Sequence, residues 1–149
     1  MKNILLSILF VIGTIAMVNA QTNAIGLRLG TGEYFGVEAS FQHYLSDANR
    51  LEADLGLNDN AFSPSVVYQW VMDLSSLEVG FKWYAGVGGS AIFYNGGAIM
   101  GIVGNLGIEY NFVDIPLQLS LDVRPGYYFG NHWNGFGFGA AGIGVRYKF

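Results

Sequence analysis

The chain has 149 residues, enough for one domain, and hydrophobic residues make up 52% of it, whereas charged residues make up only 12%. Ordinary soluble domains carry about 25% charged residues, so this composition is unusual for a protein that folds in water. The net charge of −4 and the isoelectric point near 4.9 argue against a nucleic-acid partner. The chain contains no cysteine, which excludes disulfides, cysteine-based metal sites and a lipid-modified N-terminal cysteine.

Residues 1–20 have the features of a secretory signal peptide. Lys2 provides a positive charge, residues 4–18 are mostly apolar, and Val18-Asn19-Ala20 resembles a cleavage site before Gln21. The alternative is an uncleaved membrane anchor, but the apolar stretch is short for a span and no charged flank follows it. We therefore expect export across the inner membrane and a mature domain of residues 21–149.

The mature part contains eight segments in which apolar and polar residues alternate, the pattern of half-buried strands. Glycine, asparagine, aspartate, serine and proline separate these segments, and no sustained helical period is present. In chain order the expected strands are residues 24–30, 34–44, 50–57, 65–73, 77–88, 100–112, 115–129 and 136–149. Several approach the roughly 9–11 residues that a tilted strand needs to cross a bilayer, whereas no later apolar run is long enough for a membrane helix.

The expected connections alternate in length. If the N-terminus lies in the periplasm, the outer connections are residues 31–32, 58–64, 89–99 and 130–135, and the inner ones are residues 45–49, 74–76 and 113–114. Three of the four outer connections are longer than the inner ones, which is typical of outer-membrane barrels. The sequence therefore predicts an all-β fold, an eight-stranded antiparallel up-and-down transmembrane β-barrel.

One face of the predicted strands carries all the basic residues of the mature part together with six acidic residues. The opposite face carries bulky apolar residues such as Phe41, Trp83 and Tyr147, while glycines are frequent on the charged face. An eight-stranded barrel has an interior just wide enough for side chains to fill it, so we expect the charged, glycine-rich face inside and the aromatic face against lipid. The charged residues are Arg28, Glu38, Arg50, Glu52, Asp54, Glu78, Lys82, Glu109, Asp122, Arg124, Arg146 and Lys148.

Six positive and six negative charges on one face predict a compensated network in the lumen, because an unpaired buried charge is far more costly than a paired one. Such a network favours a plugged barrel over an open pore. One alternative is a soluble secreted β-barrel with the charges on its wet outer face. Another is a narrow transport or small-molecule binding barrel, which needs a gap in the lumen or a lateral opening. His43 on the apolar face and Val67 and Val71 on the charged face fit the pattern poorly.

The chain ends in Gly144-Val145-Arg146-Tyr147-Lys148-Phe149, a glycine followed by aromatic residues at alternate positions. This ending resembles the C-terminal assembly signal of outer-membrane barrels, and the whole mature pattern is similar to small eight-stranded barrels of the OmpX and OmpA type. The resemblance implies that Gly144, Tyr147 and Phe149 are recognised by the barrel-assembly machinery. It also implies a place in the outer membrane of a Gram-negative cell, among its lipids and lipopolysaccharide. Residues 114–117 and 122–125 resemble the small barrel proteins common in Bacteroidetes.

No catalytic or metal-binding group of residues stands out. Lipid A deacylases of this shape resemble serine hydrolases with His and Ser two residues apart, but Asn134 stands at that position after His132. Asp59, Ser63 and His132 could meet on outer loops, as in palmitoyltransferase barrels, although their spacing does not require it. His43 and His132 alone make no metal site. We therefore expect no enzyme activity, cofactor or metal, and a lipid-modifying enzyme is the alternative.

The outer loops carry the remaining binding potential. Two of these loops combine aromatic rings with amide groups, a mixture that suits sugar or protein partners. The candidate contact residues are Phe93, Tyr94 and Asn95 in one loop, and His132 and Trp133, which lie between two asparagines, in the other. Aromatic residues are equally expected at the rim of a barrel, where they anchor it in the membrane. The sequence predicts a non-enzymatic structural or interaction role at the cell envelope, and it does not identify the external partner.

Overall fold

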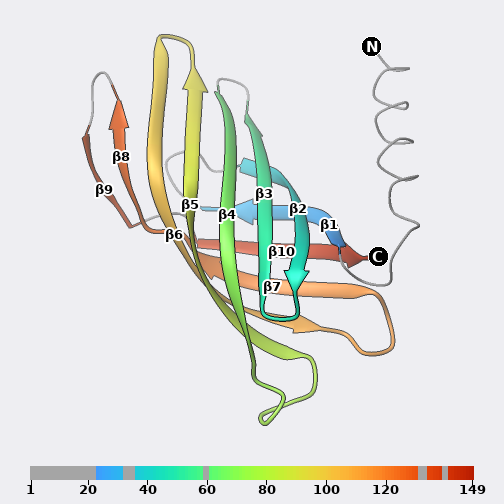
Figure 1. Cartoon of the computed structure of the whole chain (residues 1–149). Coiled ribbons are helices and arrows are strands. Elements are labelled where there is room, and N and C mark those ends of the chain that lie inside the picture. Colours follow the sequence, from blue (N-terminus) through green and yellow to red (C-terminus); the bar gives the residue numbers. More distant parts are fainter. Residues whose placement is uncertain (1–22, 32–35, 59–60, 131–133, 139–140) are drawn as a thin grey trace, which may run out of the picture.

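The computed structural model describes residues 23–31, 36–58, 61–130, 134–138 and 141–149, which form ten strands of one sheet (Figure 1). The predicted signal peptide lies outside the described residues. The strands are β1 (Asn23–Gly30), β2 (Gly36–Ser46), β3 (Asn49–Asn58), β4 (Ala61–Asp73), β5 (Phe81–Tyr94), β6 (Gly97–Asn111), β7 (Leu117–Val123), β8 (Gly126–Gly130), β9 (Asn134–Gly137) and β10 (Ala141–Lys148). Among the described residues, no helix is long and apolar enough to span a membrane.

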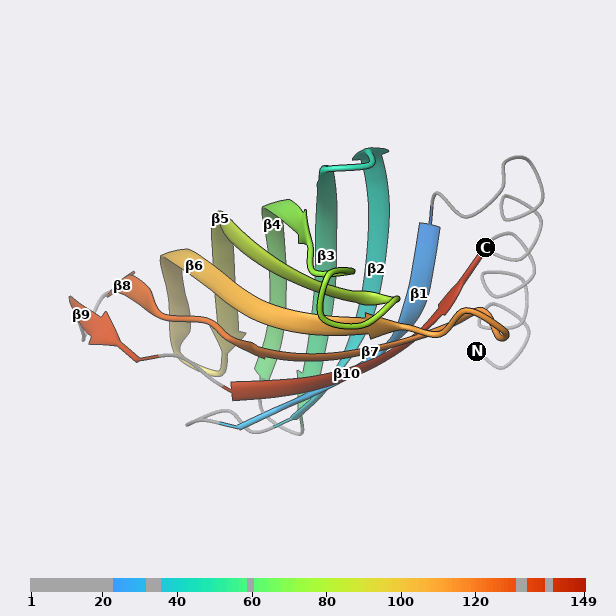
Figure 2. The ribbon, with the colours of Figure 1, turned by 90° about the horizontal axis from the view of Figure 1, so that it is seen from below.

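The sheet closes on itself into a ring of eight antiparallel strands. Each strand from β1 to β6 pairs with the next one in the chain, and β10 joins β7 to β1. Both β7 and β8 pair with β6 in one register, so together they form the seventh strand of the ring. Because β8 pairs with β9 and β7 with β10, these two form the eighth strand. The closed eight-stranded barrel predicted from the sequence is therefore confirmed (Figure 2).

The seventh and eighth strands are not continuous, contrary to the prediction for residues 115–129 and 136–149. Pro125 interrupts the seventh strand because proline has no backbone N–H to donate to the ladder, although its carbonyl accepts from Gly104 N at 2.7 Å. The register also shifts, since Val123 pairs with Ala141 but Gly126 pairs with Gly137. Between these two pairs the chain therefore advances three positions in the seventh strand and four in the eighth.

The outer connection predicted at residues 89–99 is instead a long hairpin. β5 continues to Tyr94 and β6 begins at Gly97, so Asn95 and Gly96 make the turn. Gly96 has a φ of 118°, a left-handed conformation that glycine adopts without steric cost. The expected long outer loop is therefore wrong, and the strands themselves extend outward.

The inner connection predicted at residues 74–76 is longer than expected and spans residues 74–80. Glu78 lies in this turn and is exposed, so its assignment to the inward face of a strand is wrong. The turn is held by local backbone bonds, for example Leu77 N to Leu74 O at 2.9 Å. Strand β5 accordingly begins at Phe81 and not at residue 77. The predicted contrast between long outer and short inner connections does not hold here.

Polar side chains are buried and apolar side chains are exposed, the reverse of their distribution in a water-soluble protein. Arg28, Arg50 and Arg146 are among the largest fully buried side chains, and Leu57 and Ile102 on the outside are 68% and 61% exposed. The interior of the ring is therefore polar and its outer surface apolar, as the strand pattern predicts. The misfitting Val67 and Val71 are buried inside the ring. The other misfit, His43, is exposed near the end of β2, where its Nδ1 lies 2.8 Å from Asn23 Oδ1.

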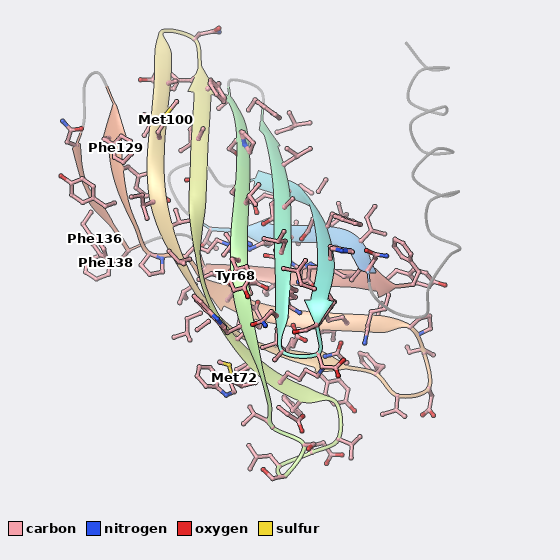
Figure 3. The ribbon with its side chains drawn as sticks, viewed as in Figure 1. Tyr68, Met72, Met100, Phe129, Phe136 and Phe138 are labelled. Carbon is pink, nitrogen blue, oxygen red and sulfur yellow. The ribbon has the colours of Figure 1, made fainter. Side chains whose placement is uncertain are left out.

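Aromatic side chains gather near both ends of the outer surface. At the outer hairpins Phe62 and Phe93 stack with ring centres 6.2 Å apart, and Phe129 and Phe136 lie on neighbouring β8 and β9 (Figure 3). The contacts at the opposite end are Tyr68–Trp70, Phe81–Tyr110, Tyr110–Phe112 and Tyr147–Phe149. Two aromatic levels flanking an aliphatic band are typical of the girdles of membrane barrels.

Candidate functional site in the barrel lumen

Alternating residues of each strand point into the ring, and the register places them in rows across the sheet. One row runs from Arg50 on β3 through Gln69 on β4 and Gly86 on β5 to Asn105 on β6. Arg50 Nε donates to Gln69 Oε1 at 2.5 Å, and Gln69 Nε2 donates to Asn105 Oδ1 at 2.8 Å. Because Gly86 has no side chain, Gln69 can reach across β5 to its partner on β6. The strand register thus converts a sequence pattern into a connected polar row.

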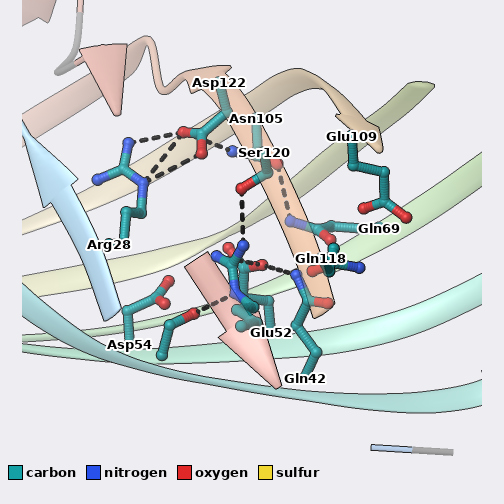
Figure 4. A network of polar contacts seen from close by, with 12 residues as sticks. Arg28, Gln42, Glu52, Asp54, Gln69, Asn105, Glu109, Gln118, Ser120 and Asp122 are labelled. Carbon is teal, nitrogen blue, oxygen red and sulfur yellow. Dashed lines mark hydrogen bonds and ion pairs between the residues drawn. The ribbon is translucent and has the colours of Figure 1, made fainter. Parts of the chain in front are cut away.

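Arg28 on β1 forms the first charged centre of the lumen (Figure 4). Its Nη2 lies 2.6 Å from Asp122 Oδ1 and its Nε lies 3.1 Å from Asp122 Oδ2, a bidentate contact. Its Nη1 lies 3.0 Å from Glu38 Oε2 on the neighbouring strand β2. To reach Asp122, the guanidinium passes over Gly142, where an added Cβ would stand 2.5 Å from Arg28 Nε. Glycine at 142 therefore gives this arginine its position.

Arg124 is the centre with the most acidic neighbours. Its Nη2 bonds Glu52 Oε1 and lies 2.8 Å from Asp54 Oδ2, both on β3 across the lumen. Its Nη1 lies 3.8 Å from Glu38 Oε2, and its Nε lies 3.6 Å from Asp122 Oδ1. Arg124 lies directly before Pro125, the residue that interrupts the seventh strand. The charge with the most ion-pair partners is therefore next to the break in the strand.

Arg146 on β10 links the same carboxylate from the other side. Its Nη2 lies 3.1 Å from Glu52 Oε2, which also accepts a bond from Gln42 Nε2. Arg146 Nε donates to Ser40 Oγ at 2.9 Å, and its Nη1 donates to Ser120 Oγ at 2.7 Å. Glu52, which is fully buried, is therefore held by two arginines and an amide. These bonds connect β2, β3, β7 and β10 through the middle of the ring.

Arg50 forms the centre nearest the inner end. Its Nη1 lies 2.6 Å from Glu109 Oε2 and donates to Tyr44 OH at 2.7 Å. The guanidinium carbon lies 4.6 Å from the ring centre of Tyr84, close enough for a cation–π contact. Asn111 Nδ2 donates to the second oxygen of Glu109 at 3.0 Å. This buried pair is thus surrounded by aromatic and amide groups that satisfy much of its hydrogen-bonding capacity.

The predicted charged residues are distributed unevenly along the lumen. Arg28, Arg50, Glu52, Asp54, Glu109, Asp122, Arg124 and Arg146 are buried and interconnected, and Glu38 joins them with its side chain 23% exposed. Lys82 and Lys148 are half-buried, and neither has a carboxylate within ion-pair distance in the described part of the chain. Glu78 lies in the exposed turn between β4 and β5, outside the ring. The six-against-six balance predicted from the sequence therefore becomes four arginines and five carboxylates in contact.

The other predicted site residues lie at the ends of the strands. Gly144 is buried and faces inward on β10, whereas Tyr147 is 55% exposed on the outer surface and stacks with Phe149. Phe93 faces outward and Tyr94 ends β5, with Asn95 in the turn. Of the remaining candidates, His132, Trp133 and Asp59 lie outside the described residues. The possible outer-loop triad therefore stays a prediction.

Uncharged polar residues complete the network, and the sequence reasoning placed only Gln118 and Ser120 of them on the polar face. They share the inward parity of the charged residues, so the alternation could have identified the rest as well, but attention to charge alone passed over most amides, hydroxyls and phenols. They are Ser40, Gln42, Tyr44, Gln69, Tyr84, Asn105, Asn111, Gln118 and Ser120.

Neither protein-family models nor curated proteins give a match to this sequence. Among solved structures, the fold is similar to the crystal structure of the N-terminal β-barrel domain of Pseudomonas aeruginosa OprF. The identity is 14%, the TM-score is 0.67, and the match covers 88% of this chain and 100% of that one. It is also similar to the solution NMR structure of the de novo designed protein TMB2.3, with 15% identity, a TM-score of 0.57 and coverage of 89% and 97%. At these identities the likeness shows the fold alone, a closed antiparallel β-barrel of eight strands.

The close packing of the Arg28 guanidinium over Gly142 can be tested directly. Substitution Gly142→Leu places side-chain atoms where the Arg28 guanidinium lies, and we expect the free energy of unfolding to fall by about 1–3 kcal/mol, as for other overpacked interiors. Urea titration of the protein folded in lipid vesicles measures this. Gly89→Val is the matched control, because an added Cβ there meets nothing closer than Gly101 O at 3.8 Å. Equal losses in both variants would contradict the packing described here.

The pair Arg50–Glu109 allows a double-mutant cycle. Arg50→Met alone leaves a buried carboxylate without its cation, and we expect a loss of about 3–5 kcal/mol of unfolding free energy. Adding Glu109→Gln removes that uncompensated charge, so the double variant should be more stable than Arg50→Met alone. The same titration in vesicles gives all four values. If the second substitution destabilises the first variant further, the pairing of these charges does not govern stability.

Proposed function

We propose that this chain is an integral outer-membrane β-barrel whose lumen is plugged by its own ionic network, with a non-enzymatic structural or interaction role at the cell envelope. The observation that carries the proposal is the reversal of polarity, with arginines and carboxylates buried inside the ring and aliphatic side chains exposed around it. Such a surface would be strongly unfavourable in water, because apolar area exposed to water raises the free energy of the folded state.

A lipid environment suits both the exterior and the backbone of this fold. Closed barrels pair their backbone groups between strands, which makes them one of the two architectures that can span a bilayer. The outward band of leucine, isoleucine and valine, flanked by aromatic residues, supports insertion into a membrane. The likeness to the OprF barrel domain supports the outer membrane as that location. A soluble secreted barrel would need the charged face outside, in water, and the apolar face inside.

The lumen network supports a plug and not a pore. Arg124 contacts Glu52 and Asp54 across the ring, and Arg28 and Arg146 continue the network to other strands. An eight-stranded barrel leaves little interior beyond what side chains occupy. A continuous aqueous path would therefore require several buried ion pairs to separate at once, at a cost of several kcal/mol per uncompensated ion.

A lipid-modifying enzyme is less well supported. In the triad considered for that activity, Ser63 would have to stand on an outer loop, but it lies within β4 beside Gly56.

Three further expectations from the sequence stay predictions. Recognition of Gly144, Tyr147 and Phe149 by the barrel-assembly machinery is one, and contact with lipopolysaccharide is another. The same holds for the narrower resemblance of residues 114–117 and 122–125 to Bacteroidetes barrels. We propose these as features of the same outer-membrane protein.

Conductance measurements test the plug. We expect the purified protein in planar lipid bilayers to give no steady channel current at neutral pH, because the ionic network occupies the lumen. The double variant Arg124→Ser with Glu52→Ser removes the cross-lumen bond and should give measurable current. Asp47→Ser in an exposed turn is the control and should stay silent. A steady open-channel current from the unaltered protein would contradict the plug and favour a narrow transport barrel.

A further inference from the structure

Two lysines at the inner end of the lumen take no part in the ionic network. Lys82 is the second residue of β5 and Lys148 is the last residue of β10, and both face inward and are half-buried. The three turns at this end, residues 47–48, 74–80 and 112–116, all belong to the described residues. Within the described part of the chain, neither lysine has a carboxylate at ion-pair distance. The inner mouth of the lumen therefore carries two ammonium groups without a direct counter-charge.

The strand register places two carboxylates opposite Lys82, but other groups hold both of them. Lys82 pairs with Asp73 on β4 and with Glu109 on β6. Asp73 accepts hydrogen bonds from Ser75 in the turn, from the hydroxyl at 2.5 Å and from the backbone N–H at 3.2 Å. Glu109 Oε2 lies 2.6 Å from Arg50 Nη1. Opposite charges at facing positions usually stabilise a sheet, so the lack of an ion pair at Lys82 is a specific feature of this end.

Lys148 has no acidic residue beside it in the sheet. It stands opposite Ala24 on β1, which is buried, and its backbone N–H donates to Pro116 O at 2.9 Å. Of the charges near Lys148, that of Lys82 acts on it most strongly, ahead of Glu109. Because like charges repel, the two ammonium groups raise the electrostatic free energy of the barrel until an anion lies close to them.

The wall between the two lysines carries two amide groups. Asn111 on β6 and Gln118 on β7 stand opposite each other, and β6 and β7 lie between β5 and β10 in the ring. Gln118 Nε2 donates to Asn111 Oδ1 at 3.3 Å. Gln118 is fully buried, yet its Oε1 has no hydrogen-bond partner among the described residues. Buried polar atoms almost always have a partner, so this acceptor indicates a donor that the chain itself does not supply.

We infer that the inner mouth of the lumen is a binding site for a phosphate group, held by the ammonium groups of Lys82 and Lys148 and by the amide of Gln118. A phosphate group carries a charge of about −1.5 to −2 at pH 7, which matches two lysines, whereas a single carboxylate matches one. Inorganic phosphate also keeps a protonated oxygen, whose O–H suits the free Oε1 of Gln118. Lysine commonly binds phosphate as a point charge.

The charges of the inner turns do not neutralise the two lysines directly. Asp47, Glu78 and Asp114 lie in these turns and are all exposed, and salt screens exposed charges more than half-buried ones. The proposed outer-membrane insertion turns this mouth towards the periplasm, but binding of phosphate does not depend on it. Two sources present the same chemistry there, a soluble phosphate and the head group of a phospholipid.

Titration of the purified protein with inorganic phosphate tests the site. The protein is folded in maltoside micelles, which contain no phosphate, and a dispersed two-dimensional NMR spectrum shows before the titration that the barrel has formed. Ionic strength is held constant with sodium chloride. We expect saturable shifts of the signals of residues 82, 111, 118 and 148 and none at the outer turn around residue 95. The absence of a saturable shift at the inner mouth would overturn the site.

Single substitutions separate the site from a general effect of charge. Lys82→Met and Lys148→Met each remove one ammonium group and should raise the dissociation constant for phosphate about tenfold. Lys148→Arg keeps the charge and should restore most of the affinity. Asp47→Asn changes the net charge by the same single unit in an exposed turn and should leave the dissociation constant within about twofold. Unchanged binding in both methionine variants, or an equal change in Asp47→Asn, would contradict the site.

A second titration distinguishes the two sources of phosphate. Dihexanoyl phosphatidic acid carries the same group on short acyl chains and is followed by the signals of Lys82 and Lys148. Tighter binding than that of inorganic phosphate identifies a lipid head group, the reverse order identifies a soluble phosphate, and either order supports the site. Binding of neither would overturn it and would leave the proposed plug standing, because the conductance measurement tests the plug separately.

Discussion

The pairing of buried arginines with carboxylates is the constraint on which the rest of this barrel depends. Four arginines and five carboxylates share the lumen of a ring of eight strands, and a single unpaired member would cost several kcal/mol. Each arginine therefore has at least one carboxylate partner within 3.1 Å, and most bridge to a strand that is not adjacent. This network holds the ring from within, where a water-soluble protein would have an apolar core.

Two features of the sequence follow from the charged interior. Glycine recurs on the inward face because a guanidinium or phenol must pass over the neighbouring strand; at Gly107, for example, a Cβ would stand 2.5 Å from Tyr84 OH. The apolar residues are displaced to the outside of the ring. The apolar and the charged residues of the chain thus occupy separate faces of the same strands, and the proposed membrane insertion rests on this separation.

The alternation of residues was sufficient to predict the ring and its polarity, because a period of two fixes which side chains share a face. Arg28, Glu52 and Arg146 could be placed in the lumen on that basis alone. Strand ends were harder. Glu78 kept the alternation of β5 although it lies in a turn, and the Asn95–Gly96 turn was passed over even though this dipeptide strongly favours a hairpin. The pairing of particular charges, such as Arg124 with Glu52, could not be predicted. It depends on the register of several strands, and the alternation within one strand does not contain this information.

Gel mobility of the membrane fraction from expressing cells, with and without boiling in SDS, tests most directly whether this chain is a closed barrel in the outer membrane with its charges inside. A closed, hydrogen-bonded ring should resist SDS at room temperature, so the protein should co-fractionate with outer membranes and change its mobility only after boiling. A protein found free in the periplasm or medium, with the same mobility before and after boiling, would contradict the account and place the twelve charges of the strand pattern on a surface exposed to water.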